Sequence, residues 1–178
     1  MSSEGALKIR LATAADVPEL SAVGSRVFRD AYGGTAPDDD IADHLEAFFS
    51  EPVVRAEISR PDVTYYMATE DDHCAGLVKM RDSDVPALVF ADSAVEVQQL
   101  YVSMDFQRRG VGALLLDAVV AATHMRGIDG IWLSVWTDAD WAVKFYIKYG
   151  FESRGEITFS LATTDFIDHL MWLPVEQE

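Results

Sequence analysis

The sequence is poor in cysteine: Cys74 is the only one among 178 residues, so no disulfide can form within the chain. A lone cysteine of this kind is usually a small buried residue, and we interpret Cys74 in that way. No apolar run approaches the ~20 residues that span a bilayer, and the N-terminus lacks the charged and then apolar layout of a signal peptide. The sequence therefore predicts a cytoplasmic protein without a membrane partner.

Basic residues are also scarce, because 14 Lys and Arg stand against 30 Asp and Glu, giving a formal net charge of −16. Proteins that bind nucleic acid need a basic surface that displaces counterions, so this charge argues against a nucleic-acid partner. A strongly acidic surface keeps a protein in solution, and it also attracts cationic ligands to a cleft. The sequence leaves both interpretations of the charge open.

Hydrophobic residues make up 49% of the chain, enough for a sizeable core in a single domain, which we place at residues 1–178. Strands are expected at 8–11, 63–70, 74–81, 94–102, 131–136, 152–162 and 168–173. Helices are expected to run to about 32 and 49, a short third helix to begin at Glu51-Pro52, and two further helices to end at Gly127 and Gly150. Two motifs, Thr13–Asp16 and Thr137–Asp140, are predicted to cap the helices that follow them. The order of elements predicts an α/β fold: a mixed, mostly antiparallel sheet of about seven strands with helices on both faces.

The most informative segment is Gln107-Arg108-Arg109-Gly110-Val111-Gly112, which lies between a strand-like run and a helix-like run. Its glycines allow a sharp turn and a close approach of backbone N–H groups to a ligand. The free N–H groups of the first helical turn favour a phosphate there, and Arg108 and Arg109 are expected to add mobile positive charge. The segment predicts a pyrophosphate site, although the dinucleotide fingerprint and the ATP phosphate loop are both absent.

Gln-x-x-Gly-x-Gly after a strand that ends Leu-Tyr-Val resembles the coenzyme A signature of the GCN5-related N-acetyltransferase (GNAT) superfamily. Residues 142–151, Ala-Val-Lys-Phe-Tyr-Ile-Lys-Tyr-Gly-Phe, are similar to the family's Ala-x-x-Phe-Tyr-x-x-x-Gly-Phe helix and turn. Residues 9–16 are similar to the usual first strand and helix entry. The resemblance covers nearly the whole chain and is specific in residues 95–151.

Within the superfamily, the sequence resembles the spermidine/spermine acetyltransferases of the PaiA type. That likeness depends on the spacing from Glu96 to Gln107 and on the runs at 131–136, 159–161 and 168–171. The resemblance implies direct transfer of an acetyl group from acetyl-CoA to a primary amine in a ternary complex. The implied acceptor is a polyamine or another small amine, and no metal is implied, since the four histidines lack ligand spacing.

The resemblance also implies which residues contact acetyl-CoA. They are Leu100, Tyr101, Val102, Gln107, Arg108, Arg109, Gly110, Val111, Gly112, Ala113, Ala142 and Lys148. For Lys148 the alternative is a lysine that faces the solvent. At Ala139 many relatives have an asparagine that bonds the pantetheine, so this contact is either lost or replaced by Asp138 or by packing against Trp141.

The chemistry needs a base, because an aliphatic amine with a pKa of about 10.4 costs about 4–5 kcal/mol to deprotonate at neutral pH. Tyr146 stands where the family commonly places the acid that protonates the leaving thiolate; the alternative is a core tyrosine. Glu96 is our candidate base, because flanking apolar residues would desolvate its carboxylate; the alternative is an exposed strand-edge residue. Gln98 and Gln99 are candidates to hold a water chain instead, and the Val102 N–H is the candidate oxyanion donor.

Other functions stay open at this stage. The acceptor is alternatively a peptide N-terminus or a lysine side chain, which would need an open groove. The missing asparagine also allows a regulator that binds acyl-CoA without turning it over. Asp38-Asp39-Asp40 is either a solvated loop or part of the acceptor site, since the region between the first two helices commonly borders that site in this superfamily. The oligomeric state also stays open, with a homodimer paired through exposed apolar residues of the last hairpin as one arrangement.

Overall fold

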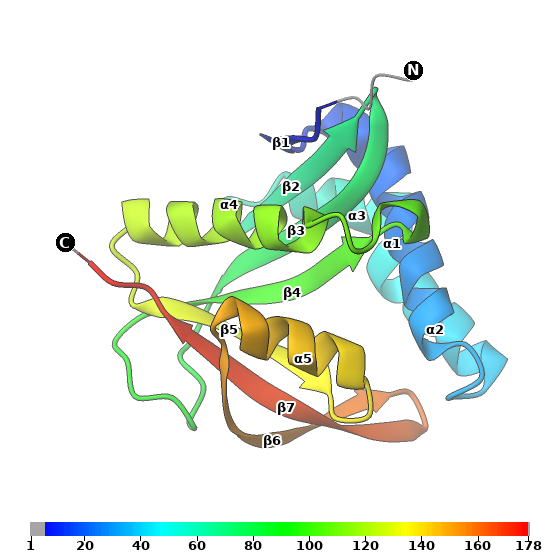
Figure 1. Ribbon diagram of the computed structural model, residues 1–178. Helices are drawn as coiled ribbons and strands as arrows, with labels where there is room; N and C mark the ends of the chain where they lie inside the picture. Colours follow the sequence, from blue (N-terminus) through cyan, green and yellow to red (C-terminus); the bar gives the residue numbers. More distant parts are fainter. Residues whose placement is uncertain (1–5, 178) are drawn as a thin grey trace. The chain divides into compact units, whose positions relative to one another are not determined.

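The structure is a computed structural model that describes residues 6–177. Its strands are β1 (Lys8–Leu11), β2 (Val63–Glu70), β3 (His73–Ser83), β4 (Ala94–Val102), β5 (Gly130–Trp136), β6 (Glu152–Leu161) and β7 (Thr164–Pro174). Its helices are η1 (Ala14–Asp16), α1 (Val17–Tyr32), α2 (Asp38–Phe49), α3 (Glu51–Ile58), η2 (Met104–Phe106), α4 (Val111–Met125) and α5 (Asp140–Tyr149). The described strands form a seven-stranded sheet in the order β1-β2-β3-β4-β5-β7-β6, which confirms the predicted mixed, mostly antiparallel fold class (Figure 1).

Contacts between residues group the chain into two compact units. Unit 1 comprises residues 6–79 and 99–118 of the described chain, and unit 2 comprises residues 80–98 and 119–177. The single domain expected from the sequence stays a prediction, and each unit is described by itself. None of the helices between residues 6 and 177 combines the length and the apolar character that crossing a lipid bilayer requires.

In unit 1, β1 and β2 pair antiparallel, with Lys8 opposite Thr69 and Leu11 opposite Tyr66 (Figure 1). Asp71 and Asp72 alone connect β2 to β3, and both have positive φ, 48° and 64°. Two successive residues of this kind make the two-residue hairpin turn whose twist matches that of paired strands. β2 and β3 are therefore joined as a hairpin.

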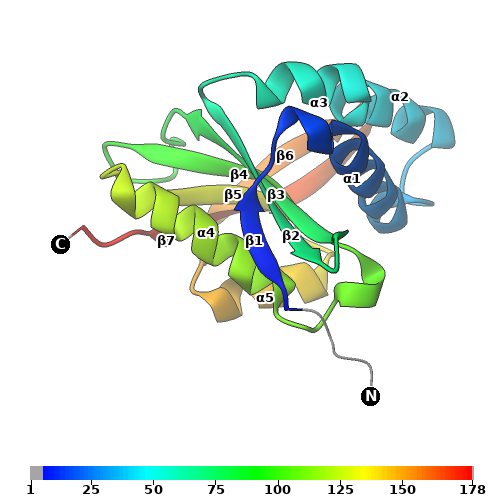
Figure 2. The ribbon, with the colours of Figure 1, turned by 90° about the horizontal axis from the view of Figure 1, so that it is seen from above.

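The core of unit 1 lies between its helices and these strands. Val17, Leu20 and Val23 line one side of α1 and belong to a buried cluster that also contains Met67 and Leu77 of the strands. Figure 2 shows α1 beside α2 and α3, in agreement with the many contacts among the three helices. This packing explains why the apolar residues of α1 recur every three or four positions.

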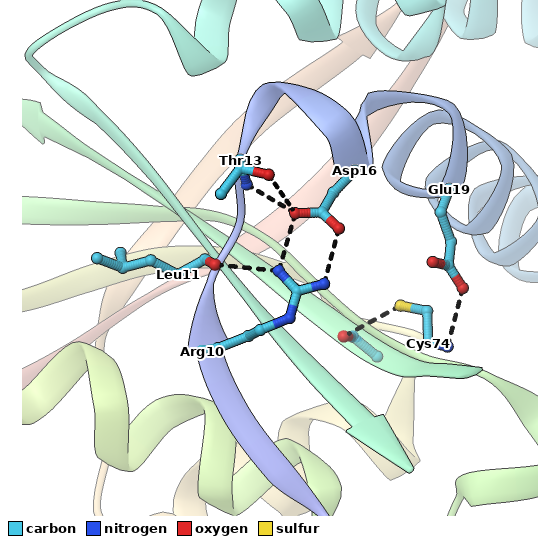
Figure 3. Close-up of polar contacts among 7 residues, drawn as sticks. Arg10, Leu11, Thr13, Asp16, Glu19 and Cys74 are labelled. Carbon is cyan, nitrogen blue, oxygen red and sulfur yellow. Dashed lines mark hydrogen bonds and ion pairs between the residues drawn. The ribbon is translucent and has the colours of Figure 1, made fainter. Parts of the chain in front are cut away.

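The start of the helical layer is fixed by polar contacts around Asp16 (Figure 3). Asp16 Oδ2 accepts a hydrogen bond from the Thr13 backbone N–H at 2.7 Å, so the predicted capping box is present, but it caps the short helix η1. α1 itself begins at Val17 without a side-chain cap. The Arg10 guanidinium donates to both Asp16 oxygens, at 2.7 and 2.8 Å, and holds the pKa of that carboxyl well below its usual range. Nearby, Glu19 accepts a hydrogen bond from the Cys74 N–H at 2.9 Å, which joins α1 to the start of β3.

In unit 2, β7 lies between β5 and β6 and pairs antiparallel with both. β4 pairs parallel to β5 at Val95–Ile131 and Glu96–Trp132. α5 packs near β5, as Figure 1 shows. β7 begins four residues earlier than predicted, because Thr164 already pairs with Leu161 across the turn.

The predicted cap of α5 is wrong. The helix begins at Asp140 with Ala139 at the N-cap, and no side chain caps it. The Thr137 hydroxyl instead donates to the Ile167 carbonyl oxygen at 3.0 Å, and the Thr137 N–H donates to the same oxygen at 2.9 Å. Thr137 therefore extends the contact with β7, a partner 30 residues away that local spacing does not reveal.

Candidate active site

The segment Gln107–Gly112, here called the donor loop, joins η2 to α4 within unit 1. Arg108 and Gly110 both have left-handed backbone conformations, with φ of 62° and 81°. α4 begins at Val111, and its first helical bond runs from the Leu114 N–H to the Gly110 carbonyl at 3.1 Å. The N–H groups of the first turn thus lack helical acceptors and point out of the helix end. A pyrophosphate fits such an end, since the helix dipole adds a favourable field.

The two arginines of the donor loop differ. The Arg109 guanidinium pairs with both Glu70 oxygens, at 2.6 and 3.0 Å, and lies 5.1 Å from the centre of the Phe106 ring. Arg109 is therefore anchored to β2, and the expectation that it adds mobile charge is wrong. Arg108 is exposed and takes part in none of the ion pairs found among residues 6–177. Of the two, Arg108 is the cation with room to reach a phosphate.

The strand before the donor loop is also fixed. Ser103, buried at the end of β4, donates from its hydroxyl to the Cys74 carbonyl at 3.3 Å. The Gln107 amide nitrogen donates to the Val102 carbonyl at 3.4 Å. Leu100, Tyr101 and Val102 are half-buried. In unit 1, the residues predicted to contact acetyl-CoA at the end of β4 and in the donor loop therefore follow one another along one segment that these hydrogen bonds hold in place.

In unit 2, α5 carries the other predicted residues of this group. The Tyr146 ring is half-buried and makes edge contacts with Phe145 and Phe151, at centroid distances of 5.2 and 5.6 Å. These contacts fix the ring plane. Ala142 is buried on the same helix, and Lys148 is exposed, as the solvent-facing alternative for that residue requires.

Glu96 of β4 has a cationic partner that the sequence did not indicate. Its Oε2 accepts a hydrogen bond from Arg81 Nε at 2.6 Å, and its side chain is 15% exposed. The carboxylate is therefore partly desolvated, as expected, but it is not surrounded by apolar groups alone. Because Glu96 stands opposite Trp132 in the parallel register, the two side chains lie on the same face of the sheet.

The same face carries a second carboxylate, Asp168 of β7. Asp168 stands opposite Trp136 and is only 3% exposed. It accepts a hydrogen bond from the Ser134 side chain, while its Oδ1 has no hydrogen-bond partner among the described residues. Burial raises the pKa of the Asp168 carboxyl above its usual range, although Ser134 and the charge of His169 act in the opposite direction. The sequence analysis did not identify Ser134 and Asp168 as candidate site residues. The feature that could have indicated them is an aspartate, Asp168, within an otherwise apolar strand.

Two further groups bear on the chemistry. Cys74 is buried, and burial raises the pKa of its thiol to about 11, so it is a core residue rather than a nucleophile. Within residues 6–177, no group of three or more His, Cys, Asp and Glu side chains is arranged to hold a metal ion.

A strand, a positive-φ turn and an open helix N-terminus form a site that suits the pyrophosphate of a nucleotide-bearing co-substrate. The chain belongs to the acetyltransferase (GNAT) family, whose sequence profile matches residues 27–151. It is an N-acetyltransferase that uses acetyl-CoA as co-substrate. The donor loop and the first turn of α4 fit the pyrophosphate of this group.

Individual relatives agree with this assignment. The chain is 27% identical over 164 residues to an uncharacterised N-acetyltransferase in the pepI 3′ region of Lactobacillus delbrueckii subsp. lactis, covering 90% of this chain and 95% of that protein. The fold is similar to that of the PaiA N-acetyltransferase from Thermoplasma acidophilum in complex with coenzyme A (TM-score 0.73, 21% identity, 92% and 98% coverage). It is also similar to Arabidopsis thaliana NAA60 in complex with acetyl-CoA (TM-score 0.76, 15% identity, 96% and 99% coverage).

Replacing Gly110 with alanine is expected to weaken coenzyme A binding about tenfold, or about 1.4 kcal/mol. A Cβ at this position meets no described atom within 4 Å, so the free protein loses only the cost of a left-handed alanine, about 1–2 kcal/mol. Binding weakens further because the loop relaxes away from the conformation that directs the N–H groups of α4 toward the phosphates. Isothermal titration calorimetry with coenzyme A measures the effect.

Gly127, just after α4, offers a matched control. It also has a positive φ, 65°, and open space around its missing side chain. Gly127→Ala should therefore cost similar stability and leave the coenzyme A affinity unchanged. Equal affinities for the two variants would show that the Gly110 conformation does not serve the coenzyme.

Proposed function

We propose that this acetyltransferase acts on the primary amine of a small cationic acceptor, such as a polyamine, by direct transfer in a ternary complex. The observation that carries the proposal is the formal net charge of −16. Part of that charge stands in the first turn of α2, where Asp38 and Asp39 are exposed. A field of this sign attracts polyamines and raises their rate of encounter, whereas it gives no such advantage to neutral peptides.

In this proposal the protein's own groups divide the work. The N–H groups at the start of α4 hold the phosphates of the co-substrate, and the Val102 N–H stabilises the oxyanion. The phenol of Tyr146 gives a proton to the leaving sulfur. Glu96 is the base expected from the sequence, with a water chain at Gln98 and Gln99 as the alternative. Cytoplasmic residence and a homodimer formed through the last hairpin stay predictions, the latter supported by the 45% exposure of Ile167.

A turnover assay tests the acceptor class. Thiol release from acetyl-CoA is followed with polyamines, simple monoamines, peptides with free N-termini and lysine peptides with blocked N-termini. We expect kcat/KM for polyamines to exceed that for peptides by at least about tenfold and to fall as salt screens the charge. A peptide preference would favour the alternative protein acetyltransferase. Coenzyme A binding without turnover of any acceptor would favour a regulator.

A further inference from the structure

Ser134 and Asp168 form a pair that the function described so far does not use. The Asp168 carboxylate is buried, yet the Ser134 side chain that donates to it is exposed. One carboxylate oxygen, Oδ1, has no hydrogen-bond partner within the described chain. Buried polar atoms normally have partners, so an unpaired carboxylate oxygen calls for a functional explanation. The pair thus links the solvent to a buried oxygen with capacity to accept a proton.

The pair stands on the face of the sheet that carries Glu96. Ser134 follows Trp132 by two residues on β5, so its side chain is on the same face as those of Trp132 and Glu96. Trp136, two residues further, is opposite Asp168. All these residues belong to unit 2. The predicted base and the Ser134–Asp168 pair therefore face the same side.

Glu96 and Asp168 differ in their partners. Glu96 accepts a charged hydrogen bond from Arg81 Nε at 2.6 Å, so one of its carboxylate oxygens already has a guanidinium partner. Asp168 has no guanidinium or ammonium group within salt-bridge distance among residues 6–177. Its registered neighbours on the same face are Trp136 and Ile157, which are not ionisable between pH 5 and 9. Of the two, only Asp168 is a buried carboxylate that has an oxygen without a hydrogen-bond partner among the described residues.

The ionisable groups around Asp168 are few. On β7, His169 is the next residue and points to the opposite face of the sheet, where Glu156 of β6 stands opposite it. On β5 the residues of the Asp168 face are Trp132, Ser134 and Trp136, and none of them titrates. On β6, Glu152 stands opposite Trp172 on this face and pairs with Arg154 at 3.1 Å. Glu96 and Arg81, on β4 and β3, form another charged pair on this face.

We propose that Asp168, acting through the Ser134 hydroxyl, takes the proton that the acceptor ammonium loses before it attacks. This inference rests on the proposed function. The ammonium N–H bond breaks and an O–H bond forms at Ser134 Oγ, while the hydroxyl proton of Ser134 moves to the Asp168 carboxylate. The nitrogen lone pair then attacks the thioester carbon and the C=O electron pair moves to the oxygen. When the carbonyl re-forms, the C–S bond breaks, the sulfur takes a proton from Tyr146, and the nitrogen gives its second proton to solvent, from which the Tyr146 phenolate is reprotonated. Asp168 later returns its proton to solvent.

The same assignment explains why the carboxylate is buried. A general base is most effective when its pKa lies near the operating pH. Burial raises the pKa of a carboxyl and so moves it in that direction. Burial raises the pKa of Asp168, whereas the exposed Ser134 provides contact with the acceptor. The pair therefore combines a carboxyl of raised pKa with a hydroxyl that can contact the acceptor, a combination that an exposed aspartate lacks.

The test compares two acceptors in the Asp168→Asn variant. For an ordinary alkylamine, protonated at neutral pH, kcat/KM is expected to fall about 100-fold. For trifluoroethylamine, which is largely deprotonated at neutral pH, the loss should be under about threefold, because no base is needed. With the alkylamine, the loss should shrink as pH rises toward the amine's own pKa of about 10.4. A merely structural role would reduce both activities alike, and that result would overturn the proposal.

Matched variants sharpen the test. Asp165→Asn removes another aspartate of β7 that is exposed and accepts a hydrogen bond from Ser160 at 2.6 Å, and it should leave both acceptors unaffected. Ser134→Ala, at an exposed site, should lose about tenfold with the alkylamine only. If Glu96→Gln shows the dependence on amine pKa while Asp168→Asn does not, Glu96 is the base and the proposal fails.

Folding and function are separable in this design. Because burial raises the Asp168 pKa, the folded state favours the protonated form, and the neutral asparagine should be at least as stable at neutral pH. Thermal unfolding of Asp168→Asn measures whether this is so. If Asp168→Asn is unfolded, the comparison of the two acceptors is made with Ser134→Ala instead. Failure of the proposed function appears as absence of turnover by the unaltered enzyme with every amine.

Discussion

Tyr146→Phe is expected to lower kcat about 100-fold while leaving coenzyme A binding unchanged. The change removes only the hydroxyl, because the ring is held by Phe145 and Phe151 at centroid distances of 5.2 and 5.6 Å, and phenylalanine keeps both contacts. Loss of a positioned proton donor typically costs about 10²- to 10⁴-fold. A thiol has a pKa of about 8.5, so a thiolate leaves more readily than an amine would, and we place the effect at the low end of that range.

The pH profile adds a second readout for Tyr146. A phenol donates a proton only while it is protonated, and its usual pKa is about 10. The enzyme should therefore lose kcat at alkaline pH, and the variant should lack this decline. Steady-state kinetics from about pH 6 to pH 10.5 measure both effects. If Tyr146→Phe has the same kcat as the unaltered enzyme across that pH range, Tyr146 is not the acid.

Tyr149→Phe is the matched control. Tyr149 lies on the same helix, is half-buried like Tyr146, and its ring packs against Phe151 at 6.1 Å. Removing its hydroxyl should change kcat less than about twofold. A similar loss in both variants would point to altered packing of α5 rather than to a missing proton.

Local patterns were enough to predict most of the fold. β2 and β4 have the bounds that alternation predicted, Val63–Glu70 and Ala94–Val102, because strands packed in a core repeat every two residues. α4 begins at Val111, directly after the glycine that the turn requires. These features are set by neighbours in sequence, so a sequence suffices to find them.

Contacts between distant residues were beyond such patterns. Arg109 was predicted to be mobile, but its partner, Glu70, is 39 residues away on β2. Arg81 is joined to Glu96 across neighbouring strands, and Ser134 to Asp168 across another pair. Each of these contacts depends on the order and register of the strands, which the alternation of apolar and polar residues along one strand does not encode. The candidate site was therefore predictable in its donor loop, and much less so in the groups that set charge and protonation.

The largest stability effect is expected from Glu57→Ala in α3. Glu57 accepts hydrogen bonds from Lys79 Nζ at 2.5 Å and from the Tyr65 hydroxyl at 2.7 Å. The Lys79 side chain is only 5% exposed, and it lies 5.8 Å from the centre of the Tyr65 ring. Removing Glu57 takes away the carboxylate that pairs with a buried ammonium, and breaking a buried ion pair in this way typically costs about 3–5 kcal/mol. Urea unfolding gives the free energy of unfolding of both proteins.

Glu51→Ala, in the same helix, separates this effect from the loss of any ion pair. Glu51 and Arg55 are 3.9 Å apart, and their side chains are 52% and 54% exposed, so the pair should contribute less than about 1 kcal/mol. A second comparison uses Lys79→Met added to Glu57→Ala. The double variant should recover part of the lost stability, because the buried ammonium is removed together with its Glu57 partner. If Glu57→Ala costs as little stability as Glu51→Ala, the Lys79 ammonium must be hydrated in the folded protein. The contacts of Glu57 with Lys79 and Tyr65 would then not be what holds α3 against β2 and β3.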